Sequence, residues 1–148
     1  MWQSIIAILG TLAGASTSAW FQQRGQRAER AAAATATHRR DALDAVTDLV
    51  TALADHRKAM WLREDARLAG VDWAGLRADS HATRAAITAP AVRVTVLLPA
   101  LAGAAQAAAA ATYAMRNATD HAELDAAREG AVTATDALTH AAGRLLAA

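Results

Sequence analysis

The sequence predicts an all-α protein in which an N-terminal transmembrane helix continues into a long helix and is followed by an antiparallel helical bundle. Three observations support this fold class. Alanine supplies 45 of the 148 residues, against only 8 glycines and 2 prolines, and this composition favours helices over sheets. The first 23 residues carry no charged side chain. From Asp41 onward, apolar residues recur every three or four positions, which is the spacing of an amphipathic helix.

The apolar run at residues 2–21 predicts a membrane anchor. Its twenty residues would form a helix about 30 Å long, which matches the hydrocarbon core of a bilayer. Trp2 stands at one end of the run and Trp20 with Phe21 at the other, and aromatic rings favour the membrane interface. We therefore expect a transmembrane anchor over residues 1–21, with these three aromatic residues at the interfaces.

A cleaved signal peptide and a buried core helix are the alternatives to an anchor. A signal peptide has basic residues before its apolar run and a small-residue cleavage site after it. Here the arginines follow the run, and Ala13-Gly14-Ala15 lies inside it. A core helix ordinarily shows a polar face, and none is evident before Gln22. The anchor is the preferred interpretation, and both alternatives stay open.

The charge distribution predicts the topology. Residues 1–40 carry five arginines and one glutamate, a net charge of +4, whereas residues 41–148 carry ten basic and thirteen acidic residues, a net charge of −3. Because basic residues stay on the cytoplasmic side of a membrane, we expect a single-pass protein of the cell membrane, with the N-terminus outside and the body in the cytoplasm. The predicted domains are the anchor at 1–21, a basic juxtamembrane helix at 22–40 and a cytoplasmic helical bundle at 41–148.

Two sets of residues in the N-terminal part are candidates for contacts. Small residues four apart allow membrane helices to approach closely, so we expect a homo-oligomer that associates through Gly10, Gly14 and Ser18. The basic helix is a candidate for contact with lipid headgroups, or, as the weaker alternative, with nucleic acid phosphate. Its candidate residues are Arg24, Arg27, Arg30, Arg39 and Arg40.

Local signals place the helices of the bundle. The first helix is expected to end at Arg67 or Leu68, because Gly70 is the favoured residue just beyond a helix end. The second helix is expected to be kinked or divided at Pro90, and a third to run from Pro99 to about Arg116. The fourth is expected to start after Asp120, which forms a capping pair with Glu123. The uncharged stretch 94–115 could instead be a second membrane span, an alternative that its high alanine content makes less favourable.

In the first bundle helix, the apolar stripe is interrupted by a polar residue. The expected stripe is Leu43, Val46, Val50, Leu53 and Met60, and Arg57 stands where another apolar residue is due. On a helix, Arg57, Trp61 and either Glu64 or Asp65 share one face. We expect these four residues to form either a contact surface for a partner protein or an internal polar cluster, and the internal cluster is the favoured interpretation.

No arrangement of residues predicts catalysis. The chain has no cysteine, which excludes thiol nucleophiles and Cys-ligated metals. The histidines and carboxylates lack the spacing of a metal site, and no glycine-rich phosphate loop occurs. We therefore expect neither an enzyme nor a cofactor.

Four segments resemble the KilB-type small proteins of actinomycetes. They are WQSIIAILGTLAG at 2–14, DHRKAMWLRED at 55–65, SHATRAAITAP at 80–90 and ATYAMR at 111–116. The resemblance runs along the whole chain. It implies a membrane-associated protein that is linked to the transfer of plasmids between mycelia and to lethality when unregulated. It carries no catalytic residues. The function that we expect is a membrane-anchored helical protein of interaction and assembly that is accessory to plasmid transfer. The alternative is an accessory factor that contacts nucleic acid through its basic helix.

Overall fold

The computed structural model describes the backbone of residues 2–147 and the side chains of residues 26–147 other than Ala28. Its elements are α1 (Trp2–Leu68), α2 (Ala74–Ala86), α3 (Thr88–Leu97), the 3-10 helix η1 (Pro99–Leu101), α4 (Ala102–Tyr113) and α5 (His121–Ala147). Residues 2–147 contain no strand, which confirms the all-helical prediction. The chain forms two compact units that divide between His38 and Arg39.

The first unit is a single stretch of α1. Every described side chain between Gln26 and His38 is exposed, Arg27 and Arg30 among them. The hydroxyl of Thr35 donates to the carbonyl of Ala31 at 3.0 Å, within the same helix. The predicted association residues (Gly10, Gly14, Ser18), the predicted interface residues (Trp2, Trp20, Phe21) and Arg24 lie outside the residues whose side chains the structure describes.

The predicted membrane placement is corrected. In the part of the chain that the structure describes, no helix combines the length and the apolar character that crossing a bilayer requires. This finding is against the transmembrane anchor at 1–21 and against the single-pass topology with the N-terminus outside. The composition gives the physical reason: the large aliphatic residues of the run end at Leu12, and the next seven residues are only Ala, Gly, Ser and Thr. Alanine is close to neutral for membrane insertion.

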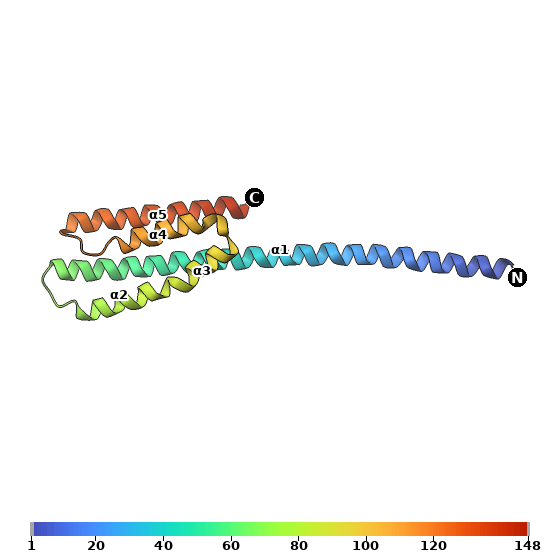
Figure 1. Ribbon diagram of the computed structural model, residues 1–148, viewed down its shortest axis with the longest axis horizontal. Helices are drawn as coiled ribbons and strands as arrows, with labels where there is room; N and C mark the ends of the chain where they lie inside the picture. Colours follow the sequence, from blue (N-terminus) through green and yellow to red (C-terminus); the bar gives the residue numbers. More distant parts are fainter. Residues whose placement is uncertain (1, 148) are drawn as a thin grey trace. The chain divides into compact units, whose positions relative to one another are not determined.

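The second unit is an antiparallel helical bundle. Its first helix is the part of α1 from Arg39 to Leu68. Helices α2 and α3 run back along it, and α4 and α5 form a second antiparallel pair (Figure 1). The stretch 94–115, considered above as a second span, is divided among α3, η1 and α4.

The core of the bundle has two apolar clusters. The larger contains Leu49 and Leu53 of α1 together with buried residues of α3, η1, α4 and α5, several of them alanines. The smaller surrounds Met60, Met115 and Leu124. Alanine side chains leave the helices room to approach closely. The abundant alanine therefore contributes to narrow packed faces rather than to a large core.

The buried face of α1 is rotated from the predicted stripe. Val46, Leu53 and Met60 are buried as expected, but Leu43 is 56 % exposed and Val50 is only half-buried. The buried positions are instead Ala42, Ala45, Val46, Leu49, Leu53, His56, Met60, Arg63, Glu64 and Ala66. Two consequences follow: a polar segment of α1 is buried, and an apolar flank of α1 is left uncovered.

The ends of the helices follow their local signals. Helix α1 ends at Leu68, and Gly70 has a φ of +70°, a left-handed conformation that glycine adopts without strain. Helices α2 and α3 are separated at Ile87. The ring of Pro90 gives the reason, because it clashes with the carbonyl four residues earlier in a continuous helix.

The start of α5 shows the predicted capping pair. The backbone N–H of Glu123 donates to the Asp120 carboxylate at 2.8 Å. The Glu123 carboxylate in turn accepts from the N–H of Thr119 at 2.7 Å and from its hydroxyl at 2.6 Å. These hydrogen bonds hold the pKa of Glu123 below its usual value. The reciprocal bonds satisfy N–H groups that have no partner inside the helix.

Candidate functional site

A buried carboxylate, Glu64, joins α1 to the turn between α4 and α5. Its side chain is fully buried, and it accepts from Nε of Arg67 at 2.7 Å and from the backbone N–H of Asn117 at 3.2 Å. Nε of Arg63 lies 3.5 Å from its other oxygen. The guanidinium of Arg67 also donates to the carbonyl of Ala118. Glu64 and its partner Arg67 thus bind two successive residues of the turn, Asn117 and Ala118.

The four residues of the predicted polar cluster have separate partners. Glu64 belongs to the buried network just described. Indole Nε1 of Trp61 donates to Asp125 at 3.4 Å, and the carboxylate of Asp65 lies 3.2 Å from Nε2 of His121. One guanidinium nitrogen of Arg57, Nη1, is buried and makes no hydrogen bond within the described residues. Three of the four residues therefore contact the turn before α5 or its first turns, rather than one another.

The opposite side of the bundle contains a basic cavity, which sequence reasoning missed. It has a volume of about 160 Å³ and is lined by residues of α1, α2, α4 and the turn after α4. We call it the arginine cavity, and its lining residues are His56, Met60, Arg63, Ser80, His81, Arg84, Tyr113 and Arg116. A sequence signal was available for His56 and Arg63, which continue the three–four spacing of Leu49, Leu53 and Met60. The pairing of Arg84 with Tyr113 depends on tertiary packing and has no local signal.

The side chains around the arginine cavity support one another. The guanidinium of Arg84 lies over the ring of Tyr113, 3.9 Å from its centroid. His56 meets the same ring edge-on at 5.6 Å, and its Nδ1 lies 3.0 Å from the Thr83 hydroxyl. Burial, together with the positive charges of Arg84 and Arg63, lowers the pKa of His56 to about 4. The imidazole is therefore neutral near pH 7.

Arg63 is the buried cation of this cavity. Its Nη1 donates to the Ser80 hydroxyl at 3.3 Å, and its guanidinium lies 5.3 Å from the ring centroid of Trp73. Burial lowers the pKa of Arg63, an effect that the nearby Glu64 opposes and that Arg116 and Arg77 reinforce. The positive charge of Arg63 is therefore largely removed from water, and the negative charge of Glu64 compensates it only in part.

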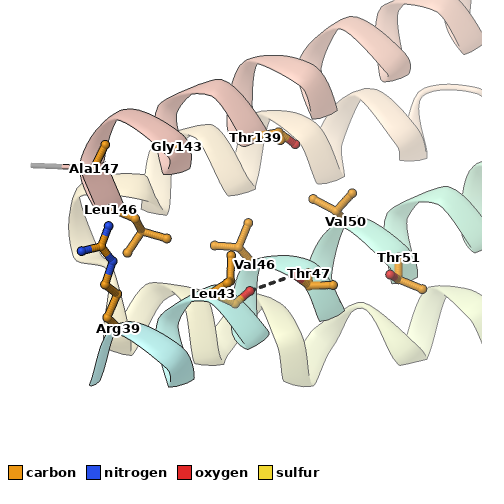
Figure 2. A pocket seen from close by; sticks show the side chains of 10 residues that line it. All are labelled: Arg39, Leu43, Val46, Thr47, Val50, Thr51, Thr139, Gly143, Leu146 and Ala147. Atoms are coloured by element: carbon orange, nitrogen blue, oxygen red, sulfur yellow. Dashed lines mark hydrogen bonds between the residues drawn. The ribbon is translucent and has the colours of Figure 1, made fainter. Parts of the chain in front are cut away.

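An apolar groove lies at the other end of the bundle, between α1 and α5. It has a volume of about 470 Å³. Figure 2 shows Val46 and Val50 of α1 and Leu146 of α5 extending into the space between the two helices. Leu43, which is 56 % exposed, belongs to the same surface. We call this surface the α1–α5 groove, and its lining residues are Arg39, Leu43, Val46, Thr47, Val50, Thr51, Thr139, Gly143, Leu146 and Ala147.

The predicted basic residues that the structure describes are exposed. Arg27 and Arg30 belong to the first unit, and Arg39 and Arg40 to the second. Of these four, only Arg39 lines the α1–α5 groove. Among the described residues, no group of three or more histidine or carboxylate side chains is placed to hold a metal ion.

Comparisons with known proteins establish the family. The model of the KilB plasmid transfer protein family matches residues 43–146, which is most of the bundle. The chain is also 47 % identical over 145 residues to Protein KilB of Streptomyces lividans, and the match covers 95 % of each chain. The chain belongs to the KilB family. No solved structure matches it.

Membership of the KilB family confirms the resemblance seen in the sequence and supports a role related to plasmid transfer. Membership of the family does not by itself support the membrane association that the resemblance also implied. All the residues that line the arginine cavity fall inside the stretch matched by the KilB model. Most of the α1–α5 groove does so as well, with Arg39 and Ala147 just outside it.

Proposed function

We propose that this KilB protein acts in plasmid transfer as a helical interaction protein, and that its α1–α5 groove binds an amphipathic helix of another protein of the transfer machinery. The observation that carries the proposal is the uncovered apolar flank of α1. Leu43 is 56 % exposed and Val50 is only half-buried, although Val46 between them is buried in the core.

The shape and chemistry of the groove fit a helix. A groove between two helices is a common receptor for the apolar face of a third, whose side chains at three–four spacing occupy it. The threonines at its edges, Thr47, Thr51 and Thr139, are exposed and polar. Arg39 is the one charged lining residue, so the occupant that fits best has a carboxylate beside its apolar stripe.

Replacing Leu43 with glutamine tests this proposal. Loss of a leucine contact is worth about 1.5–3 kcal/mol, so we expect partner affinity to fall by about tenfold or more. The frequency of plasmid transfer from donor cells that carry the variant should fall with it. Because Leu43 is exposed, the midpoint of thermal unfolding should hardly change. Sedimentation analysis of the purified full chain would show whether the occupant is a second copy.

The matched control is Val71→Gln. Val71 is also 56 % exposed but lies in the turn between α1 and α2, away from the groove. This variant should transfer plasmid at the normal frequency. If Leu43→Gln transfers as well as Val71→Gln, the groove is not the docking surface.

A second candidate function is contact with nucleic acid through the basic residues. The supporting observation is that Arg27, Arg30, Arg39 and Arg40 are all exposed. We expect any DNA binding to weaken steeply as salt rises, because bound arginines release counterions from the phosphates. Replacing these four arginines with glutamine should lower both the affinity and its salt dependence. DNA binding that is unchanged in this variant would contradict this candidate.

A further inference from the structure

We propose that the arginine cavity is a binding site for a phosphate group, supplied either as free inorganic phosphate or as the terminal group of a small phosphate monoester. This site is separate from the α1–α5 groove and shares no lining residue with it.

The charge of the cavity favours an anion. Three of its eight lining residues are arginines and none is a carboxylate, and one of its two histidines, His56, is neutral near pH 7. Arg77 and Arg67 also act on Arg63 from nearby, whereas Glu64 is the one anion that acts on it. Glu64 already accepts hydrogen bonds from Arg67 and Asn117. Arg84 and Arg116 are exposed, whereas Arg63 is buried, and a buried positive charge is unfavourable unless an anion compensates it.

Arg63 and Arg84 contribute to the cavity in different ways. The side chain of Arg63 is only 8 % exposed, and its Nε makes no hydrogen bond within the described part of the chain. The nearest acceptor to this Nε is Oε1 of Glu64 at 3.5 Å, which also makes no hydrogen bond within the described residues, so Arg63 contributes positive charge to the cavity rather than a free Nε donor. The guanidinium of Arg84 lies 3.9 Å from the centroid of the Tyr113 ring, a cation–π contact that does not require its N–H groups as hydrogen-bond donors.

The size and the arrangement of the donors favour phosphate over other anions. A volume of about 160 Å³ corresponds to roughly five water molecules, which suits a small anion rather than a larger organic ligand. The arginines come from several directions: Arg63 from α1, Arg84 from α2 and Arg116 from the turn after α4. A tetrahedral phosphate has oxygens for several donors, whereas a planar carboxylate is satisfied by a single arginine fork.

The experiment is a calorimetric titration of the full-length protein with inorganic phosphate and, separately, with the small monophosphate glycerol 3-phosphate. Chloride is used to keep the ionic strength constant, because surface charges are screened by salt. We expect at least one of the two to bind with one site per chain. Binding of both shows that the free phosphate group suffices, and binding of the monophosphate alone identifies the ester as the ligand.

The decisive variant is the double replacement of Arg84 and Arg116 by glutamine. Both residues are exposed at their outer parts, so the variant is expected to fold, as circular dichroism would verify. Loss of two charge-assisted hydrogen bonds should weaken phosphate binding by about tenfold or more. The matched control is Arg144→Gln on α5, also exposed and outside the cavity, which should bind as the wild type does. The proposal is overturned if neither probe binds the wild type, or if the double variant binds as tightly as the control.

Discussion

Replacement of Glu64 by glutamine is expected to lower the free energy of unfolding by about 3–5 kcal/mol, the cost of removing one partner from a buried ion pair. Glutamine has nearly the same shape, so the change isolates the charge. It leaves Arg67 and the buried Arg63 without their carboxylate, and it turns one acceptor oxygen into an N–H donor that faces them. Because the free energy of unfolding of a typical domain is only about 5–15 kcal/mol, this loss would be a large share of the total stability.

The measurement is denaturant unfolding followed by circular dichroism, with Asp48→Asn as the control. Asp48 pairs with Arg93 at 2.9 Å between two half-exposed side chains, and exposed pairs contribute only about 0–1 kcal/mol. The two variants remove the same charge from the same helix, but only one of them removes it from a buried site. Equal losses of stability in both would show that the network around Glu64 does not stabilise the bundle.

Mild acid is the second condition with a large expected effect, and it acts through His56. The pKa of this imidazole is lowered from 6.5 to about 4 in the folded state. As the pH falls below 6.5, the unfolded chain gains a proton that the folded chain does not, so stability decreases. The decrease continues to about pH 4, below which both states are protonated. A difference of this size is worth about 3 kcal/mol in total, and most of it is reached by about pH 4.5.

His56→Gln tests the assignment of this acid sensitivity. The variant should lose about 2–3 kcal/mol less than the wild type between neutral pH and about pH 4.5, because it has no imidazole to protonate. His140→Gln, at an exposed position of α5, should behave as the wild type. The lowered pKa of Glu123 does not affect the comparison, because Glu123 is present in the wild type and in both variants. An acid sensitivity that is unchanged in His56→Gln would assign the effect to other groups.

The sequence predicted the helices well wherever a local signal determines the backbone. Gly70 marks the end of α1, Pro90 divides α2 from α3, and Asp120 with Glu123 starts α5. Each of these signals acts within one helical turn, so no knowledge of the tertiary structure is needed. The family resemblance was also available from short runs of sequence, and the comparisons confirm it.

The candidate sites were less predictable, because they depend on how the helices are rotated. The apolar spacing of α1 is compatible with several neighbouring faces, and alanine fits all of them. Packing against the other helices buries Leu49, His56 and Arg63 rather than Leu43 and Arg57. The arginine cavity combines residues from separate elements, and no sequence window contains them together. The predicted anchor was wrong for another reason: absence of charge is not the same as apolar character, and the small residues of its second half contribute little to membrane insertion.

The network around Glu64 also determines which alignment of the helices is adopted. Faces made largely of alanine look alike after a shift of one helical turn, so apolar packing alone distinguishes poorly between neighbouring alignments. Glu64 receives the backbone N–H of Asn117, and Arg67 donates to the carbonyl of Ala118. A shift by one turn would move these charged groups about 5.4 Å from their partners and leave them buried and unpaired. A chain with little side-chain variety thus obtains a single native alignment from a few charged atoms.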